Sequence, residues 1–147
     1  MLTVLLWMCI EGKCNWVSEP LSQESAVIAM CESGDTKNVG SVDWHAVNVN
    51  RDGTIDRGAW QFNNYWVWNT KDRWLINPIA KKIGLTGNQF FKMYPTPNDA
   101  PPLVQYEVFN YMWDNGFGWE HWASSKSCWG KWMEITPHGQ AILREDG

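Results

Sequence analysis

The dipeptide Asp52-Gly53 is the feature that most restricts how this chain can fold. An Asp-Gly pair between two strand-like segments is a strong signal for a two-residue hairpin turn, because these residues readily adopt the backbone conformation that such a turn requires. Residues 46–50 and 54–57 flank the dipeptide and can pair across it. The sequence therefore predicts a β-hairpin over about Ala46–Arg57, with Asp56 on its second strand.

Polar residues follow the hairpin within an aromatic run. Gln61 and Asn63 lie in the segment 60–68, which we expect to be a loop that leads into a short helix. The rest of the chain is interpreted as the frame that holds Asp56, Gln61 and Asn63 opposite one upstream carboxylate, Glu32.

Glu32 lies near the end of a predicted helix. Ser18-Glu19-Pro20 is typical of a helix start with proline in the first turn, and Ser22 is an alternative N-cap. The helix is expected to run to about Ser33 and to stop at Gly34, a residue type that is common just after a helix. The apolar residues Ile28 and Ala29 lie about one turn before Glu32. Glu32 is therefore expected at the edge of an apolar face and at the negative end of the helix dipole.

The remaining pattern is one of short helices joined by turns, which together with the hairpin predicts an α+β fold dominated by helix. We expect an N-terminal extension over residues 1–17, one folded domain over 18–132 and a C-terminal tail over 133–147. The further helices are expected at about 72–83, 88–93, 102–115 (capped by Asn98 or Asp99) and 119–125.

Composition limits the class of protein. With 147 residues, of which 44% are hydrophobic and 19% charged, the chain suits one globular domain. Its net charge of −4 and the lack of a long basic run give no reason to expect a nucleic-acid partner. No stretch is long enough to span a bilayer. The apolar run 2–10 lacks the basic start and the cleavage site of a secretory signal, so we expect it to be buried as a helix or strand.

The metal-binding and redox residues do not form a convincing site. The three histidines lack ligand spacing, and the calcium-like run from Asn48 has Ala59 where a bidentate glutamate is needed. We therefore expect neither a metal nor a cofactor. The four cysteines allow three pairings and contain no Cys-x-x-Cys motif, so they are expected as disulfides in an oxidising compartment or as buried thiols in a cytoplasm.

Glu32 and Asp56 are expected in contrasting environments. Apolar neighbours and the negative helix end both disfavour the charged form of Glu32, which raises its pKa and suits a general acid. Asp56 has Asn48, Asn50 and Asn63 around it in the sequence, and their amides can donate hydrogen bonds that favour a carboxylate. Two carboxyl groups of this kind are the arrangement that cleaves glycosidic bonds. From spacing alone, two ordinary surface carboxylates remain the simpler interpretation.

Several stretches within residues 21–128 resemble the lysozyme-like superfamily. Asn48–Asn63 resembles the β-hairpin of animal-type lysozymes. Ile28–Gly34, with its Cys-Glu-Ser-Gly sequence, resembles the end of the catalytic helix in lytic transglycosylases and resuscitation-promoting factors, and Gly58–Phe62 resembles their Gly-x-x-Gln segment. Asp114–Cys128 is similar to the Gly-Trp-x-x-Trp-x-x-Cys end of those factors and to the matching helix of lysozymes.

The resemblance implies a lysozyme-like α+β fold, mostly helical, with one small β-hairpin beside the active-site groove. It implies that Glu32 is the general acid and that Asp56 is the nucleophile or electrostatic stabiliser. It also implies a disulfide between Cys31 and Cys128, which would tie the acid-bearing helix to the C-terminal helix. The candidate substrate-binding residues are Gln61, Asn63, Asn50, Ser33, Trp119 and Trp122.

The activity implied by the resemblance is that of a muramidase, which hydrolyses the β-1,4 bond between N-acetylmuramic acid and N-acetylglucosamine in peptidoglycan. One alternative is a lytic transglycosylase, in which the muramoyl 6-hydroxyl attacks and leaves a 1,6-anhydro product. Another is a non-catalytic wall-binding or virion structural module. The expected partners are peptidoglycan glycan strands, and the chain is expected to be a monomer or part of a virion. A wall-directed activity without an evident signal suggests a phage lysin or virion-associated enzyme that acts on the bacterial wall.

Overall fold

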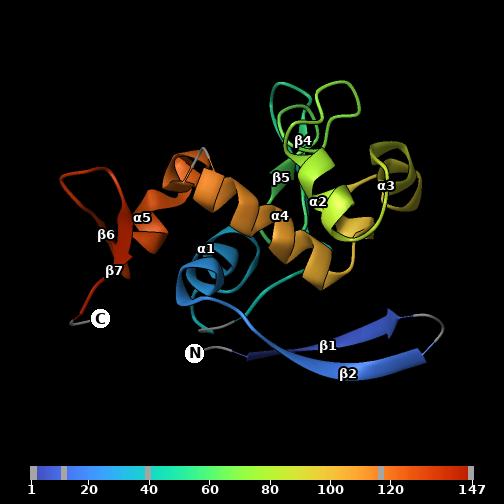
Figure 1. Cartoon of the computed structure of the whole chain (residues 1–147). Coiled ribbons are helices and arrows are strands. Elements are labelled where there is room, and N and C mark those ends of the chain that lie inside the picture. Colours follow the sequence, from blue (N-terminus) through green and yellow to red (C-terminus); the bar gives the residue numbers. More distant parts are fainter. Residues whose placement is uncertain (1–2, 11–12, 39–40, 116–117, 146–147) are drawn as a thin grey trace.

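The computed structural model describes residues 3–10, 13–38, 41–115 and 118–145. This part of the chain forms five α-helices, two 3₁₀ helices and three small antiparallel sheets (Figure 1), so the α+β class is confirmed. The elements are, in chain order, β1 (Thr3–Ile10), β2 (Lys13–Pro20), α1 (Gln23–Ser33), β3 (Val47–Val49), β4 (Ile55–Arg57), β5 (Phe62–Asn63), α2 (Ile76–Lys82), α3 (Gly87–Met93), η1 (Pro97–Asp99), α4 (Pro102–Asn115), η2 (Gly118–Ser125), α5 (Lys126–Trp129), β6 (Met133–Ile135) and β7 (Ala141–Leu143).

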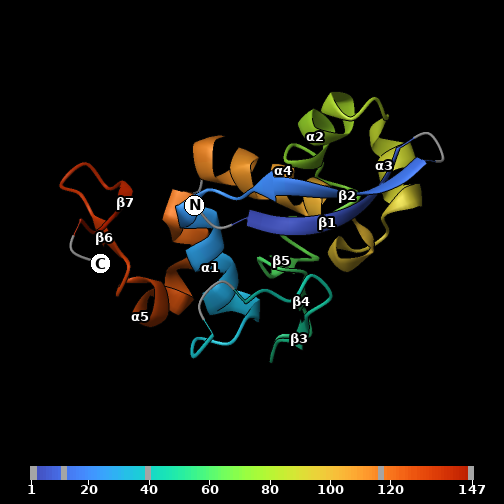
Figure 2. The same cartoon turned by 90° about the horizontal axis from the view of Figure 1, so that it is seen from below.

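The N-terminal segment forms a two-stranded hairpin. β1 and β2 pair antiparallel from Thr3 opposite Pro20 to Ile10 opposite Lys13. The hairpin lies along one side of the body, below α1 and α4 in Figure 1 and in front of α4 in Figure 2. The predicted helix start at Ser18–Pro20 is therefore wrong, because these residues complete β2. The alternative cap, Ser22, is confirmed: it is the N-cap of α1.

Helix α1 is anchored at both ends, and this fixes the position of Glu32 in its last turn. The Oγ of Ser22 accepts the backbone N–H of Ser25 at 3.2 Å. At the other end, the helix stops at Gly34 as predicted. A Cβ atom on Gly34 would collide with the backbone carbonyl oxygen of Ser41, so only glycine allows this close approach of the two segments.

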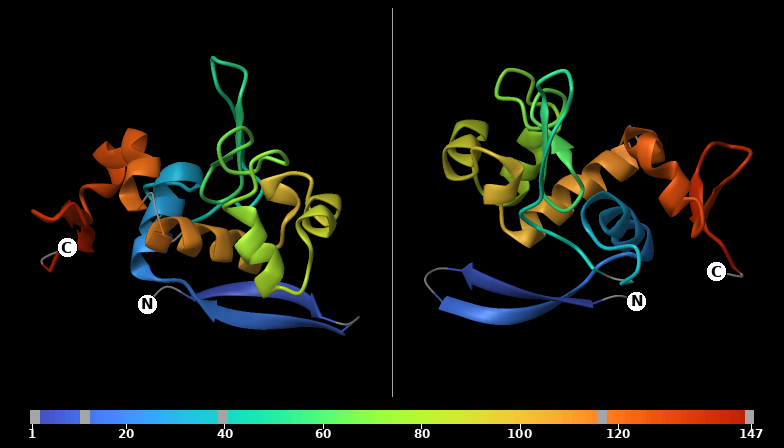
Figure 3. Two further views of the ribbon diagram at one scale, coloured as in Figure 1. Left: turned by 45° about the horizontal axis from the view of Figure 1, so that its top comes forward. Right: turned by 180° about the vertical axis from the view of Figure 1, so that it is seen from behind.

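The predicted hairpin is present as β3 and β4, and Gly53 at its turn has a positive φ of 85°. A third strand, β5, which the sequence did not predict, pairs with the other edge of β4. Asp56 consequently lies between Asn48 on β3 and Asn63 on β5. Turns occupy residues 64–67, as expected for a loop, and the next helix, α2, begins at Ile76. The β3–β4 hairpin projects from the body on the side opposite β1 and β2 (Figure 3).

The later helices lie where the sequence predicted them, although some begin at a different residue. Helix α4 has the predicted range, whereas α2 begins four residues later than predicted, at Ile76. The segment before α2 is instead held as a loop by Arg73, whose Nε donates to the Thr70 carbonyl at 2.6 Å. Asp99 does not cap α4; its carboxylate accepts the N–H of Thr96 and caps η1. The helix expected over 119–125 is the 3₁₀ helix η2.

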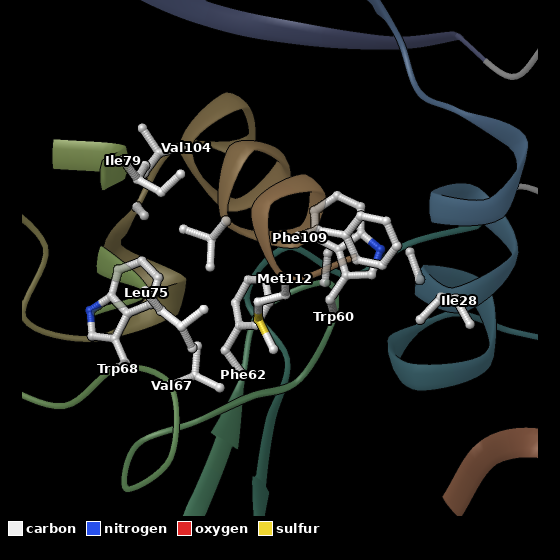
Figure 4. Packing of buried hydrophobic residues seen from close by; sticks show 14 of the residues in the cluster. Ile28, Trp60, Phe62, Val67, Trp68, Leu75, Ile79, Val104, Phe109 and Met112 are labelled. Atoms are coloured by element: carbon white, nitrogen blue, oxygen red, sulfur yellow. The ribbon is translucent and has the colours of Figure 1, made fainter. Parts of the chain in front are cut away.

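The core surrounds α4, with the aromatic run after the hairpin on one side and α1 on another (Figure 4). The ring of Phe109 on α4 packs at a tilt against both Trp60 and Trp122, with ring centroids 5.0 and 4.8 Å apart. The three fully buried indoles of this part of the core also donate hydrogen bonds, because a buried N–H without an acceptor is costly. Trp60 donates to the carbonyl of Ser25, Trp122 to that of Trp60 and Trp129 to that of Trp122.

The C-terminal segment is folded where the sequence predicted a tail. β6 and β7 pair antiparallel, and Met133 at the start of β6 is fully buried in the core. The backbone N–H of Arg144 donates to the carbonyl of Trp132 and extends this pairing, while its side-chain Nε donates to the carbonyl of Gly130 at the end of α5. Among the described residues, no helix has the length and apolar character needed to cross a membrane.

The fully buried side-chain amide of Gln105 connects α4 to Gly58 and Ala59, the residues that follow β4 and form the exit of the hairpin. Its Oε1 accepts the N–H of Ala59 at 2.9 Å, and its Nε2 donates to the carbonyls of Trp44 and Ala100, both at 3.0 Å. A Cβ on Gly58 would lie 2.5 Å from Oε1, and Gly58 has a φ of 83°, so this approach requires glycine.

We predict that Gln105→Leu lowers the free energy of unfolding by about 3 kcal/mol, because a side chain of similar size leaves one N–H and two carbonyl groups buried without a partner. Urea denaturation followed by circular dichroism measures the change. Gln23→Leu on the exposed surface of α1 is the matched control and is expected to change stability by less than about 0.5 kcal/mol. Equal stability of the two variants would show that the Gln105 amide does not connect these elements.

Candidate functional site

A groove of about 640 Å³ runs between α1, the three-stranded sheet and η2. It brings together Glu32 and Asp56, which the sequence predicted to lie opposite each other. Its lining also includes three other predicted site residues, Gln61, Asn63 and Trp122. The full described lining is Glu32, Asp56, Gln61, Asn63, Trp66, Val67, Asp72, Trp74, Glu120, His121, Trp122 and Ser124.

The carboxyl group of Glu32 is largely buried and therefore desolvated. Trp122, which is only 1% exposed, lines the same groove. Burial raises the pKa of Glu32 above its ordinary value of 4.5; a hydrogen bond from Ser125 opposes the shift, and the charge of Asp56 adds to it. The Oγ of Ser125 donates to Oε1 of Glu32 at 2.5 Å. Desolvation is the largest of these effects, so the environment favours a protonated Glu32 at higher pH than an exposed glutamate.

A disulfide joins the helix that carries Glu32 to the segment that carries Ser125. Cys31 and Cys128 are bonded, with their Cα atoms 5.8 Å apart and a sequence separation of 97. The pairing implied by the resemblance is therefore confirmed. Because Cys31 immediately precedes Glu32 and Cys128 lies three residues after Ser125, the bond holds the acid and its hydrogen-bond donor together.

Asp56 has a polar environment. The side-chain amide nitrogens of Asn50 and Asn63 donate to its two carboxylate oxygens at 2.9 and 2.8 Å. Asn48, the third expected donor, instead donates to Oδ1 of Asn50 and orients that residue. The Oδ1 of Asn63 also accepts the backbone N–H groups of Tyr65 and Trp66, so one side chain fixes Asp56 and shapes the following turn. The two amides therefore hold the Asp56 carboxylate in a fixed orientation.

The other predicted site residues occupy different places. Gln61 lines the groove with a positive φ of 54°, and its Nε2 donates to the carbonyl of Gly58. Asn50 and Ser33 do not appear in the described lining: Asn50 holds Asp56, while Ser33 accepts the N–H of Asp43 and connects α1 to the next loop. The Trp119 indole donates to the carbonyl of Gly139 in the C-terminal hairpin, so Trp122 is the tryptophan beside Glu32.

Two residues that the sequence did not single out as site residues are His121, which lines the groove, and Ser125, which bonds Glu32. Burial lowers the pKa of His121, and the charge of Asp56 partly opposes this shift. Ser125 touches the acid directly, yet it is separated from Glu32 by 93 residues. In the sequence, the only feature that could have pointed to His121 or Ser125 is that both lie in the Trp-rich segment before Cys128, which also contains Trp122.

Exposed aromatic rings and acidic side chains complete the groove. Trp66 and Trp74 are 68% and 45% exposed, which is unusual for such large apolar side chains. Asp72 and Glu120 bring the number of lining carboxylates to four, and the described lining contains neither lysine nor arginine. Among the residues that the structure describes, no group of three or more His, Cys, Asp or Glu side chains has a metal-binding arrangement.

Comparisons of the chain with protein-family models, with curated proteins and with solved structures give no match.

We predict that Glu32→Gln is more stable than the parent protein at neutral pH. A pKa raised in the folded state means that the group's contribution to stability is present below pH 4.5 and is lost as the pH rises through the folded-state pKa. Glutamine cannot ionise and still offers Oε1 to Ser125, so it avoids this loss. Urea denaturation should show a stability gap that widens between pH 4.5 and 7 and closes below pH 4; a constant gap would contradict the assigned environment.

Proposed function

We propose that this protein is a glycosidase of the lysozyme type that cleaves the β-1,4 bond between N-acetylmuramic acid and N-acetylglucosamine in peptidoglycan. The observation that carries the proposal is the pairing, in one groove, of a desolvated Glu32 whose pKa is raised with an Asp56 that accepts two amide hydrogen bonds. Two carboxyl groups in opposite environments supply the acid and the stabilising charge that glycoside cleavage requires.

Glu32 is the general acid in this proposal. Its protonated carboxyl donates to the glycosidic oxygen as the bond to the anomeric carbon breaks, so the leaving sugar departs as a neutral alcohol. Burial keeps the proton on Glu32 until a substrate oxygen accepts it, and Ser125 orients the carboxyl through Oε1. The resulting carboxylate then takes a proton from the water that attacks the anomeric carbon, which restores the acid.

Asp56 stabilises the positive charge that develops on the anomeric carbon. Its carboxylate acts either as an electrostatic partner of the oxocarbenium ion or as a nucleophile that bonds to it before water releases the product. The amides of Asn50 and Asn63 hold this carboxylate in place before substrate arrives. Such preorganisation matters because a charge that is already oriented needs no rearrangement during the reaction.

The rest of the groove suits a sugar polymer. Trp66 and Trp74 present exposed rings that can stack on the apolar faces of sugars. Gln61 and Asn63 place amide groups in the lining, where N-acetyl and hydroxyl groups of a glycan find hydrogen-bond partners. In this proposal the protein acts on the bacterial wall from outside the cytoplasm, as a phage lysin or virion-associated enzyme would.

We predict that Glu32→Gln lowers the rate of cell-wall clearing by at least about 100-fold, because general acid catalysis is lost. Glu24→Gln, at the other end of the same helix and outside the described groove lining, is the matched control and should clear walls like the parent. Turbidity loss of purified walls measures both. If Glu32→Gln clears walls as well as the parent, Glu32 is not the acid and a binding or structural role becomes the better account.

Mass spectrometry of the released fragments tests which nucleophile completes the reaction. The proposal predicts reducing ends, because water attacks the anomeric carbon. Fragments that end in 1,6-anhydro sugars would mean that the muramoyl 6-hydroxyl attacks, and the protein would then be a lytic transglycosylase with the same acid.

A further inference from the structure

A second cavity, of about 450 Å³, lies beside the groove, and the turn at residues 64–69 separates the two. Trp66 and Val67 of this turn line the groove, whereas the residues on either side of them line the second cavity. We name this cavity the Arg57 pocket. Its described lining is Arg57, Asn64, Tyr65, Trp68, Asn69, Thr70, Lys71, Pro95 and Thr96.

The alternation of side chains along β4 places the two sites on opposite faces of one strand. Asp56 lies between Asn48 and Asn63 and faces the groove. Its neighbour Arg57 therefore faces the other way, opposite Phe62, and lines the pocket. A ligand in the Arg57 pocket would thus contact the same strand that carries the proposed stabilising carboxylate.

The two sites have opposite charge. The described lining of the groove has four carboxylates and no lysine or arginine. The described lining of the pocket has Arg57 and Lys71 and no carboxylate. Because like charges repel and are poorly screened in partly buried sites, an anionic substituent on a bound glycan would be repelled by the groove and attracted to the pocket.

The guanidinium of Arg57 is incompletely satisfied. Among the described residues, its Nε is the buried side-chain polar atom that has no hydrogen-bond partner. The other arginine Nε groups for which the structure gives partners donate to backbone carbonyls, Arg73 to Thr70 and Arg144 to Gly130. An oxyanion that bonds the guanidinium and shifts it slightly toward the cavity would give Nε an acceptor. The planar fork of arginine matches a carboxylate in particular, since two parallel N–H groups meet two oxygens.

The remainder of the lining fits a peptide better than a simple ion. The Nδ2 of Asn64 can donate to a peptide carbonyl, whereas the Oδ1 of Asn64 accepts the N–H of Ile55 and the Asn69 amide already bonds Tyr65 and Lys71. The exposed ring of Tyr65 and the nearly buried ring of Trp68 give apolar surface against which small side chains can pack. A phosphate needs donors and positive charge but gains nothing from these rings.

We propose that the Arg57 pocket is a second binding site, which takes the terminal carboxylate of a short peptide attached to the glycan strand in the groove. The proposal rests on the function proposed above, because it assigns the pocket to a branch of the same substrate. The pocket then favours cleavage of glycan that carries free peptide branches over bare glycan.

Nuclear magnetic resonance of the arginine side chains tests the binding step on the full chain. The Arg57 Nε–H signal, assigned with Arg57→Lys, is followed as N-acetyl-alanyl-alanine is added. We expect this signal to shift, while the Nε–H signals of Arg73 and Arg144, which already have acceptors, stay in place. The C-terminal amide of the same peptide should cause no shift. An absent shift with the free acid overturns the proposal, and an equal shift with inorganic phosphate replaces it with an unselective anion site.

Cleavage kinetics distinguish this proposal from the enzyme proposal. On glycan that carries peptides, Lys71→Met should raise KM about threefold and Arg57→Lys about tenfold, whereas KM on peptide-free glycan should not change. Lys92→Met, an exposed lysine on α3 outside both described linings, is the control. If the parent cleaves neither glycan, the glycosidase proposal fails. If it cleaves both and the variants show the parent's preference, the pocket proposal alone fails.

Discussion

Three buried indole N–H groups join the elements on which the groove depends. The chain of bonds runs from Ser25 of α1 to Trp60, from Trp60 to Trp122 and from Trp122 to Trp129. It links the acid-bearing helix to the exit of the hairpin and to the C-terminal helices. Each bond lies in a dry core, where losing a donor or an acceptor leaves an unpaired polar group. The position of Glu32 relative to Asp56 is therefore a property of the core and not of the loops around the groove.

The same framework gives the two carboxyl groups different surroundings. Glu32 ends a helix that packs on the indole chain and the Cys31–Cys128 bond, so it loses water and meets one hydroxyl donor. Asp56 lies in a short, partly exposed sheet in which asparagine amides approach it from both sides. One fold thus gives a carboxyl group whose pKa is raised by burial and a carboxylate that two amide hydrogen bonds hold in place, which is the combination that the proposed reaction uses.

Local sequence signals predicted the local structure. The Asp-Gly turn places the hairpin, and α4 has the predicted ends. The pairing of β1 with β2 and of β6 with β7 was not predicted. Ser18-Glu19-Pro20 at the end of β2 is typical of a helix start, and the three-residue strands β6 and β7 are too short to show an alternation of apolar and polar residues. The Glu32–Ser125 contact joins residues far apart in sequence, and no spacing rule reports it. The Cys31–Cys128 pairing came from the resemblance alone, since four cysteines leave three pairings open.

The central claim is that the fold holds a proton on Glu32 above the ordinary range of a glutamate. The most direct measurement is a carbon-13 NMR titration of the Glu32 carboxyl, assigned with Glu32→Gln, in the parent and in two variants. We predict a midpoint above 4.5 in the parent, a higher one in Ser125→Ala and a lower one in Asp56→Asn, because Ser125 lowers this pKa and Asp56 raises it. A parent midpoint at or below 4.5 would contradict the account.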